Sequence, residues 1–249
     1  MSLLDSYDES EEIIKAKDTT KDKTKLPEIA IVTFKQDLIE IIEKDSKYKK
    51  CGMIEAGESI PIYKTIYNNK EIVIYRTLIG GPATAGIMEE LIARGVKKFI
   101  FFGSCGTLSK DIKEGHFILP SEAYRDEGTS YHYLPVSDFI EVSTVNKLAD
   151  IFDKNNIKYI KTKTWTTDAM FKETVNKMKD RKDAGCLVVE MECASIMAVS
   201  KVRKVETYQF LYSDDTLDSK QWDARTLLDD RSPLLKICLE IALKIADEI

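Results

Sequence analysis

Short apolar runs of β-type residues alternate with amphipathic stretches of helical spacing from residue 26 to the end of the chain, and no Pro- or Gly-rich linker interrupts them. Residues 28–32 (EIAIV) predict a buried strand, and residues 36–44 carry apolar side chains on one helical face. Repeated along the chain, this succession predicts one α/β domain over residues 26–249 rather than two small domains.

One pair of predicted strands departs from this alternation. Residues 61–67 and 71–78 flank Asn68-Asn69-Lys70, and these residue types tolerate the positive φ of a tight turn. The pair predicts a hairpin, so the sheet should be mixed rather than all parallel. Further strands are expected at 97–102, 116–123, 159–165, 186–190 and 206–212, and further helices at 83–94, 141–155, 171–182, 193–201 and 234–249.

Residues 1–25 differ from the rest of the chain. They hold twelve charges of mixed sign and little apolar periodicity, so we expect a loosely held extension, with a neighbouring subunit as one surface against which it could pack.

Composition excludes several classes of partner. The chain has 37 Lys and Arg against 42 Asp and Glu, a net charge of −5, and no long basic face, which argues against nucleic acid. Five scattered Cys and two His indicate neither a disulfide framework nor a metal site, and a reducing cytoplasm fits best. The apolar runs are strand-length and the N-terminus is acidic, so we expect a soluble cytoplasmic protein that binds no membrane.

Polar residues follow three of the predicted strands, where ligands of open α/β sheets collect. Gly103-Ser104-Cys105-Gly106 offers a hydroxyl and unshielded N–H groups for an anion or a sugar oxygen, or it is only a turn. Glu190-Met191-Glu192 offers carboxylates for vicinal hydroxyls, or it begins a helix. Ser213-Asp214-Asp215 offers an acid of raised pKa, or a cap.

Four separated motifs carry a family resemblance. These are GSCG at 103–106, RDEGTSYHYLP at 125–135, VEMECA at 189–194 and SD at 213–214, and in this order they resemble the purine nucleoside phosphorylase and uridine phosphorylase family from about residue 26 onward. The resemblance implies a three-layer α/β/α sandwich with a mixed central sheet. It also implies cleavage of a nucleoside N-glycosidic bond by inorganic phosphate, the co-substrate, giving free base and ribose 1-phosphate without a cofactor or metal.

The resemblance also implies roles for individual residues. Glu192 would hold the ribose 2′- and 3′-hydroxyls, and Asp214, or Asp215 as its alternative, would protonate or hydrogen-bond the base. Met191 would line the ribose and base, and Trp165 would pack on the base. His132 would reach the ribose 5′-hydroxyl of its own or a neighbouring subunit, or it is a histidine satisfied within its loop. Ser104 would contact phosphate, with Lys35 as the cation left near the first strand. The remaining expected substrate-binding residues are Cys105, as a packed small residue, with Gly106, Glu190 and Arg125.

The chain departs from the family pattern where phosphate should bind. Phe101 stands three residues before Ser104, where the family usually has Arg, and residues 33–37 (TFKQD) replace the Gly-Asp-Pro loop with its following Arg. A dianion would lose bidentate partners there, leaving Lys35 and Arg125 as candidate cations.

Three readings therefore stay open: a nucleoside phosphorylase, a nucleosidase that uses water, and a weakly catalytic nucleoside-binding relative. Base preference is also open, because residues 125–135 resemble the uridine branch and Ser213-Asp214 the purine branch. The resemblance favours a homodimer or homohexamer.

Overall fold

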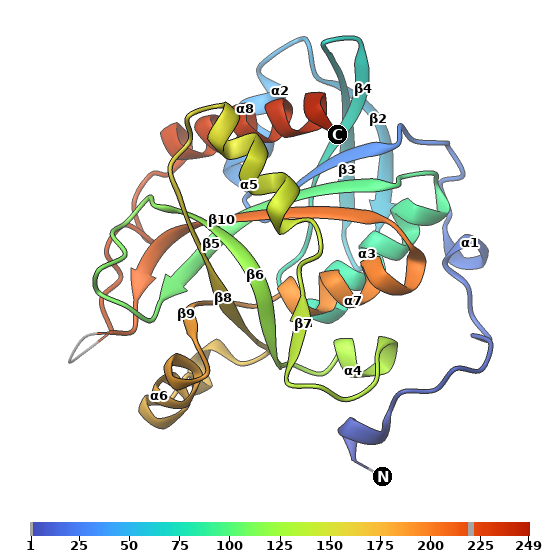
Figure 1. Cartoon of the computed structure of the whole chain (residues 1–249). Coiled ribbons are helices and arrows are strands. Elements are labelled where there is room, and N and C mark those ends of the chain that lie inside the picture. Colours follow the sequence, from blue (N-terminus) through green and yellow to red (C-terminus); the bar gives the residue numbers. More distant parts are fainter. Residues whose placement is uncertain (1, 219–221) are drawn as a thin grey trace.

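The computed structural model describes residues 2–218 and 222–249, and in them a mixed sheet forms the middle of three layers (Figure 1). The strands are β1 (Ile29–Thr33), β2 (Lys49–Glu55), β3 (Ser59–Tyr67), β4 (Lys70–Arg76), β5 (Lys98–Thr107), β6 (Phe117–Asp126), β7 (Phe139–Glu141), β8 (Tyr159–Thr167), β9 (Cys186–Glu190) and β10 (Glu206–Thr216). The fold class predicted from the sequence, α/β with a mixed central sheet, is confirmed.

Helices cover both faces of this sheet. On one face α2 (Gln36–Glu43), α5 (Val145–Lys154) and α8 (Ser232–Glu248) pack together, and on the other α3 (Gly81–Ala93) packs against α7 (Cys193–Arg203) (Figure 1). The shorter elements are η1 (Leu3–Asp5), α1 (Ala16–Thr19), α4 (Ser130–Tyr133), η2 (Met170–Lys172) and α6 (Val175–Asp183). No helix in the described residues combines the length and the apolar character needed to cross a membrane.

Strand β5 is the hub of the sheet. It runs parallel to β1 on one side and to β10 on the other, and its last residues Gly106 and Thr107 pair antiparallel with Val189 and Val188 of β9. Because β10 continues through β6 and β8 back to β9, these five strands close on themselves. The carboxyl ends of β5, β8, β9 and β10 therefore meet in one region of the molecule.

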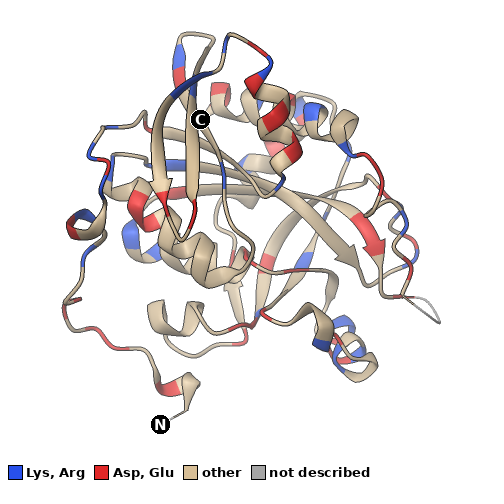
Figure 2. Ribbon diagram, turned by 180° about the vertical axis from the view of Figure 1, so that it is seen from behind, with Lys and Arg blue, Asp and Glu red and all other residues tan. Residues whose placement is uncertain are grey.

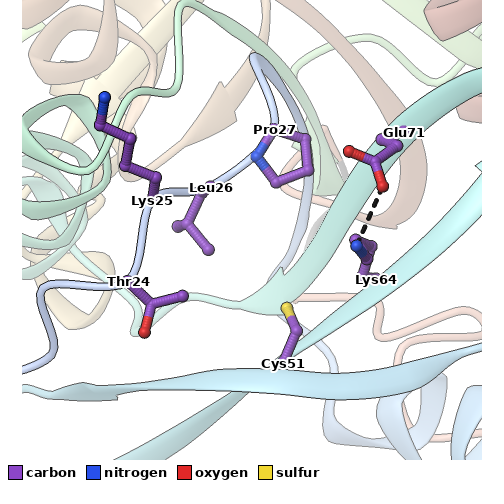
Figure 3. Close-up of a pocket in the computed structure, with 7 residues that line it drawn as sticks. All are labelled: Thr24, Lys25, Leu26, Pro27, Cys51, Lys64 and Glu71. Atoms are coloured by element: carbon purple, nitrogen blue, oxygen red, sulfur yellow. Dashed lines mark hydrogen bonds and ion pairs between the residues drawn. The ribbon is translucent and has the colours of Figure 1, made fainter.

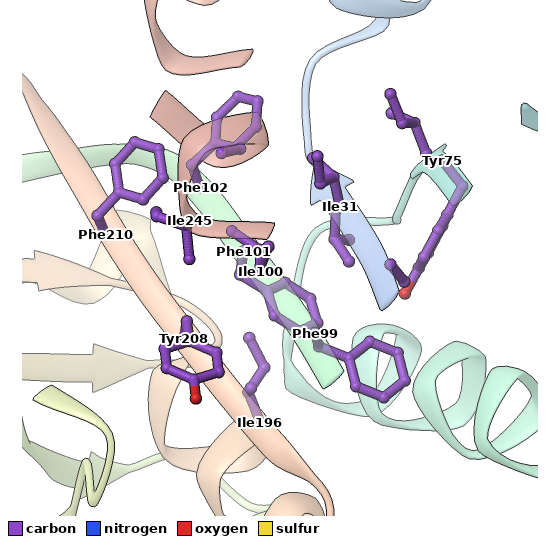
Figure 4. Packing of buried hydrophobic residues seen from close by; sticks show 14 of the residues in the cluster. Ile31, Tyr75, Phe99, Ile100, Phe101, Phe102, Ile196, Tyr208, Phe210 and Ile245 are labelled. Carbon is purple, nitrogen blue, oxygen red and sulfur yellow. The ribbon is translucent and has the colours of Figure 1, made fainter. Parts of the chain in front are cut away.

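The core is built on aromatic residues of the two central strands. Phe102 of β5 stacks on Phe210 of β10 with ring centroids 5.4 Å apart, and Phe99 stacks on Phe101 at 6.0 Å (Figure 4). All four are fully buried. An uninterrupted apolar strand of this kind is expected where helices cover both faces of a sheet.

Most of the predicted elements are present, but β2 and β7 were not predicted, and the helix expected at 171–182 is divided into η2 and α6. The hairpin joins β3 to β4 through Asn68 and Asn69 at φ 46° and 64°, as predicted. β5 extends five residues and β10 four residues beyond their expected ends, so the GSCG segment and Ser213-Asp214-Asp215 belong to strands and not to loops. Pairing between these two segments keeps both extended.

The N-terminal segment packs along its own chain. It passes α3 and ends beside α4 (Figure 1), and its contacts to α3 and α4 give the expected extension a defined place. Asp22 forms an ion pair of 2.8 Å with Arg94, whose side chain is only 2% exposed and also donates to the carbonyl oxygens of Thr24 and Met53. Figure 2 shows acidic and basic residues interspersed along the segment.

Replacing Arg94 should destabilise the fold. Arg94→Met removes a buried cation that holds four partners, since Arg94 also lies 3.5 Å from Glu90, and we expect a loss of about 3 kcal/mol in the free energy of unfolding, measured in urea. Lys97→Met is the matched control, because its ion pair with Glu28 is largely exposed and should contribute less than about 1 kcal/mol. Equal losses in the two variants would contradict the anchoring role of Arg94.

Candidate functional site

The turn from β9 into α7 fixes two glutamates in opposite roles. Glu190 is buried, and its carboxylate accepts hydrogen bonds from the N–H groups of Glu192 at 2.8 Å and Cys193 at 2.6 Å and from the hydroxyls of Thr166 at 2.6 Å and Thr164 at 3.3 Å. The two N–H groups lie at the start of α7, where an anion is favoured. Glu190 thus stabilises the corner, and its expected role toward the substrate stays a prediction.

Glu192 is the carboxylate left available by this corner. It is 7% exposed, and its Oε1 accepts a hydrogen bond of 2.7 Å from the N–H of Gly80, just before α3. Burial raises the pKa of Glu192 to about 8, with further contributions from the charges of Glu190 and Asp168. A buried carboxyl group without a paired cation is costly unless a ligand supplies hydrogen-bond donors.

Two glycines allow this approach of α3 to α7. Gly80 has φ 97°, which side-chain-bearing residues rarely adopt. At Gly81 a Cβ atom would lie 2.3 Å from the hydroxyl oxygen of Ser195 on α7. Gly80 precedes the first turn of α3 and Pro82 lies within that turn, but the sequence does not indicate that the N–H of Gly80 binds Glu192.

Asp214 sits in an irregularity of β10. Ser213 pairs with Cys105 and Asp215 with Gly106, so Asp214 is the extra residue of a β-bulge, a device that redirects side chains. Its side chain is fully buried, with Oδ1 3.0 Å from Nη2 of Arg231 and 3.2 Å from the donating hydroxyl of Thr226. Its Oδ2 has no hydrogen-bond partner among the described residues.

Asp215 has a different environment. It is half-buried, and Oδ2 accepts a hydrogen bond of 2.7 Å from Nε1 of Trp222. Burial raises its pKa. Glu173, which the sequence analysis did not single out, lies near Asp215, and burial together with that charge raises the pKa of Glu173 to about 7. Only folding brings residue 173 to residue 215.

The expected residues on β5 lie between these acids. Ser104 and Gly106 are half-buried, and Cys105 is buried with its thiol 3.6 Å from the carbonyl oxygen of Tyr212. Burial raises the pKa of the Cys105 thiol well above its ordinary value, and nearby Asp215, Glu190 and Asp214 add to this effect. Acids from β9 and β10 therefore surround one end of β5, and the thiol is suited to packing and not to nucleophilic attack.

Aromatic side chains occupy the neighbourhood where the missing Arg residues would be expected. The ring centroids of Phe34 and Phe101 lie 6.4 Å apart, and a Cβ atom at Gly103 would lie 2.9 Å from the Phe34 ring. Lys35, half-buried, follows the end of β1, where Thr33 pairs with Phe102. Lys35 lies two residues after Thr33, and Ser104 lies two residues after its partner Phe102.

Arg125 is used within its own loop. Its guanidinium donates to the carbonyl oxygens of Pro135 and Leu134 and to the hydroxyls of Ser130 and Ser137, at 2.7 to 3.2 Å, and it stacks on the ring of Tyr131. Its donors hold residues 130–137 in place. The loop therefore uses these donors, and the expectation that Arg125 serves as a cation for the substrate stays a prediction.

The other expected residues divide into core and surface. Trp165 is fully buried in a cluster with Leu108 and Val189, and its Nε1 donates to Asp126 at 3.0 Å. The ring has no exposed face in this structure, and its expected place on the base stays a prediction. Met191 is half-buried beside Glu192, and His132 is exposed on α4.

A hollow elsewhere on the molecule is separate from these residues. A cavity of about 310 Å³ is lined by residues 24–27, Cys51, Lys64 and Glu71 (Figure 3). It lies at the starts of β1 and β4, whereas the acids gather at the carboxyl ends of β5, β8 and β9 and within β10.

Comparisons with known proteins agree with this arrangement. A family model described as the phosphorylase superfamily matches residues 28–243. Guanosine phosphorylase of Halorubrum lacusprofundi is 27% identical over 60% of this chain, a match that spans only 63% of that protein. A DeoD-type purine nucleoside phosphorylase of Bacillus cytotoxicus is 26% identical over 72% of this chain and 77% of its own.

Solved structures share the fold. Purine nucleoside phosphorylase from Toxoplasma gondii, in complex with immucillin-H, superposes with a TM-score of 0.72 at 19% identity, over 91% of this chain and 94% of its own. AMP nucleosidase from Bacteroides thetaiotaomicron gives 0.69 at 20% identity, over 90% of each chain. At these identities the likeness concerns the fold.

The raised pKa of Glu192 predicts a pH-dependent stability. The folded protein keeps a proton that the unfolded chain releases above about pH 4.3, so the free energy of unfolding should fall as pH rises toward 8 and level off above it. Glu192→Gln should remove this pH-dependent loss. Its free energy of unfolding should then exceed that of the wild type by on the order of 2–4 kcal/mol between pH 5 and 8. Urea unfolding at several pH values measures it, with exposed Glu114→Gln as control. Parallel profiles for Glu192→Gln and wild type would contradict the raised pKa.

Proposed function

The chain belongs to the phosphorylase superfamily, and we propose that it cleaves the N-glycosidic bond of a purine ribonucleoside. The observation that carries this proposal is the pair of buried acids with free capacity, Glu192 at the β9–α7 corner and Asp214 in the bulge of β10. The first suits the ribose hydroxyls, which would donate to its carboxylate. The second suits the base, where a proton is needed.

The charge of the site fits the chemistry of bond cleavage. As the bond breaks, positive charge develops on the ribose and negative charge on the departing base. Asp168 and the carboxylate form of Glu192, stabilised by the ribose hydroxyls that donate to it, would stabilise the first, and Asp214, whose Oδ2 has no hydrogen-bond partner among the described residues, would act on the second as the acid. Arg231, 3.0 Å from Oδ1, would then stabilise the carboxylate that remains after proton transfer.

Purines are the bases that this arrangement favours. As the acid at the base, Asp214 would serve an acceptor nitrogen such as N7, and two of the relatives are named as guanosine and purine nucleoside phosphorylases. A pyrimidine nucleoside lacks this nitrogen, so uridine is the informative comparison.

Inorganic phosphate is the acceptor that we propose, because the named relatives are phosphorylases. The Ser104 hydroxyl and Lys35 would hold the phosphate, because each lies two residues beyond the last pair between β5 and β1, Phe102 with Thr33. No cofactor or metal is needed for this reaction.

Water is the second candidate acceptor, and a specific observation favours it. Phe34 and Phe101 are apolar where a dianion would need Arg, and Arg125 is engaged by its loop. An attacking water does not need a dianion site.

A substrate panel tests the reaction and its acceptor. Inosine, guanosine, adenosine and uridine are incubated with the protein in the presence and absence of phosphate, and the products are chromatographed. We expect purine release that requires phosphate and yields ribose 1-phosphate. Phosphate-independent release of free ribose would replace phosphorolysis by hydrolysis, and the absence of release from every nucleoside would overturn the proposal.

Asp214 should matter more for purines than its neighbour does. Asp214→Asn removes the donated proton and should lower kcat for a purine nucleoside by about 10²-fold or more, the usual range for a general acid. Asp215→Asn is the matched control. Because Asp215 accepts a hydrogen bond from Trp222, kcat of this variant should fall by less than about tenfold. A larger fall in kcat for Asp215→Asn than for Asp214→Asn would identify Asp215 as the acid instead.

A further inference from the structure

Glu127 is a buried carboxylate that the proposed reaction does not use. It lies in the loop between β6 and α4 and is only 5% exposed. Its carboxylate accepts hydrogen bonds from the N–H of Ser130 at 3.0 Å, from the hydroxyl of Ser130, and from the hydroxyl of Ser195 on α7 at 2.6 Å. An ionised carboxylate only accepts hydrogen bonds, so Glu127 can serve all three donors at once.

Arg125 balances the charge of Glu127 through a shared hydroxyl. Nε of Arg125 donates to the Ser130 hydroxyl at 2.7 Å, and that hydroxyl donates in turn to Glu127. Both charged side chains are buried. A buried carboxylate is stable when hydrogen bonds and an opposite charge satisfy it. The loop therefore holds the Glu127 carboxylate in one position.

Ser195 connects this loop to α7. It is fully buried and follows Glu192, the N-cap residue of α7, by three residues. Residues three apart lie on the same side of a helix, about one turn from each other. The hydrogen bond from Ser195 to Glu127 thus ties the first turn of α7 to the loop between β6 and α4.

Ser195 also lies against the glycine pair that begins α3. A Cβ atom on Gly81 would lie 2.3 Å from the hydroxyl oxygen of Ser195 and 3.3 Å from that of Thr129 in the loop. Gly81 therefore fits closely between α7 and the loop. Its neighbour Gly80 supplies the N–H that donates to Oε1 of Glu192 at 2.7 Å. The contacts that place Ser195 thus also place the partner of the Glu192 carboxyl group.

The loop has a second connection on the other side of the β9–α7 corner. The N–H of Gly128 donates to Oδ2 of Asp168 at 2.8 Å. Asp168 follows the end of β8, and β8 pairs with β9 as far as Thr166 with Glu190. The loop is therefore bound at both flanks of the corner that carries Glu192, at Ser195 and at Asp168.

We propose that Glu127 is a positioning residue for Glu192. Through Ser195 it keeps α7 beside the N–H of Gly80, and so it holds the Glu192 carboxyl group where the ribose 2′- and 3′-hydroxyls can donate to it. The inference rests on the proposed function, because the ribose hydroxyls are what Glu192 must reach. It assigns Glu127 no contact with the substrate, but it makes the preference for a ribonucleoside over a 2′-deoxyribonucleoside depend on Glu127.

Ser195→Ala tests this connection with a small change. It removes one hydroxyl and leaves Glu127 its bonds to Ser130. We expect the ratio of kcat/KM for inosine to that for 2′-deoxyinosine to fall by about tenfold, because only inosine has a 2′-hydroxyl for Glu192. Glu127→Gln keeps one acceptor oxygen and should show a smaller fall in the same ratio.

Tyr133→Phe is the matched control. It also removes one hydroxyl, which joins α4 to Glu89 at 3.1 Å, about two turns along α3 from Gly80. This variant should keep the wild-type ratio. Because the ratio compares two substrates on the same folded variant, a loss of stability alone does not change it. An unchanged ratio in Ser195→Ala, or an equal fall in Tyr133→Phe, would overturn the proposal.

Hydrogen exchange separates this proposal from the reaction itself. In the protein without substrate, NMR should show that the Gly80 amide exchanges about tenfold faster in Ser195→Ala than in the wild type or in Tyr133→Phe. Equal exchange at Gly80 in all three would overturn the positioning role even if nucleosides are cleaved. If the wild type binds inosine without cleaving it, the proposed reaction fails, and the ratio is then measured from the dissociation constants of the two nucleosides. A wild type that binds neither nucleoside would overturn both proposals.

Discussion

The hydrogen bonds around Glu190 are the constraint on which the site depends. A buried carboxylate takes the two N–H groups that begin α7 and two threonine hydroxyls of β8, and so it fixes the angle between strand and helix. That angle points Glu192 toward the N–H of Gly80 and away from the sheet. Glu190 has a structural role, and it holds Glu192, two residues later, in a buried position where its carboxyl group can still bind a ligand.

The closed part of the sheet brings the remaining acids to the same place. Since β5 pairs with β1, β10 and β9, residues distant in sequence surround its carboxyl end, and the bulge in β10 sets Asp214 apart from the regular pairing. Arg231 balances Asp214, while Glu192 has no such cation. Once ribose hydroxyls stabilise the carboxylate form of Glu192, this cluster of acids suits a substrate that becomes positive as it reacts.

Much of the fold could be predicted from the sequence, because strands, turns and motifs depend on local patterns. Alternating apolar runs located the strands, the Asn pair located the hairpin, and the motif order indicated the family. What the sequence could not show was which way polar side chains turn. Glu190 and Glu192 stand two residues apart, yet only the hydrogen bonds distinguish their roles. Arg125 and Trp165 lie in motifs that suggest ligand contacts. In the structure, however, the Arg125 side chain donates to its own loop, and the Trp165 side chain is buried in the core. Arg231 and Glu173 carry no local signal, because only folding brings them to Asp214 and Asp215.

A crystal structure of the protein with an intact purine nucleoside, obtained without phosphate, tests the central claim most directly. The account predicts that the ribose 2′- and 3′-hydroxyls donate to Glu192 and that the base lies with N7 within hydrogen-bond distance of Oδ2 of Asp214. A nucleoside bound in another place, such as the cavity near Cys51, or a ribose that leaves Glu192 without a hydroxyl partner, would contradict it.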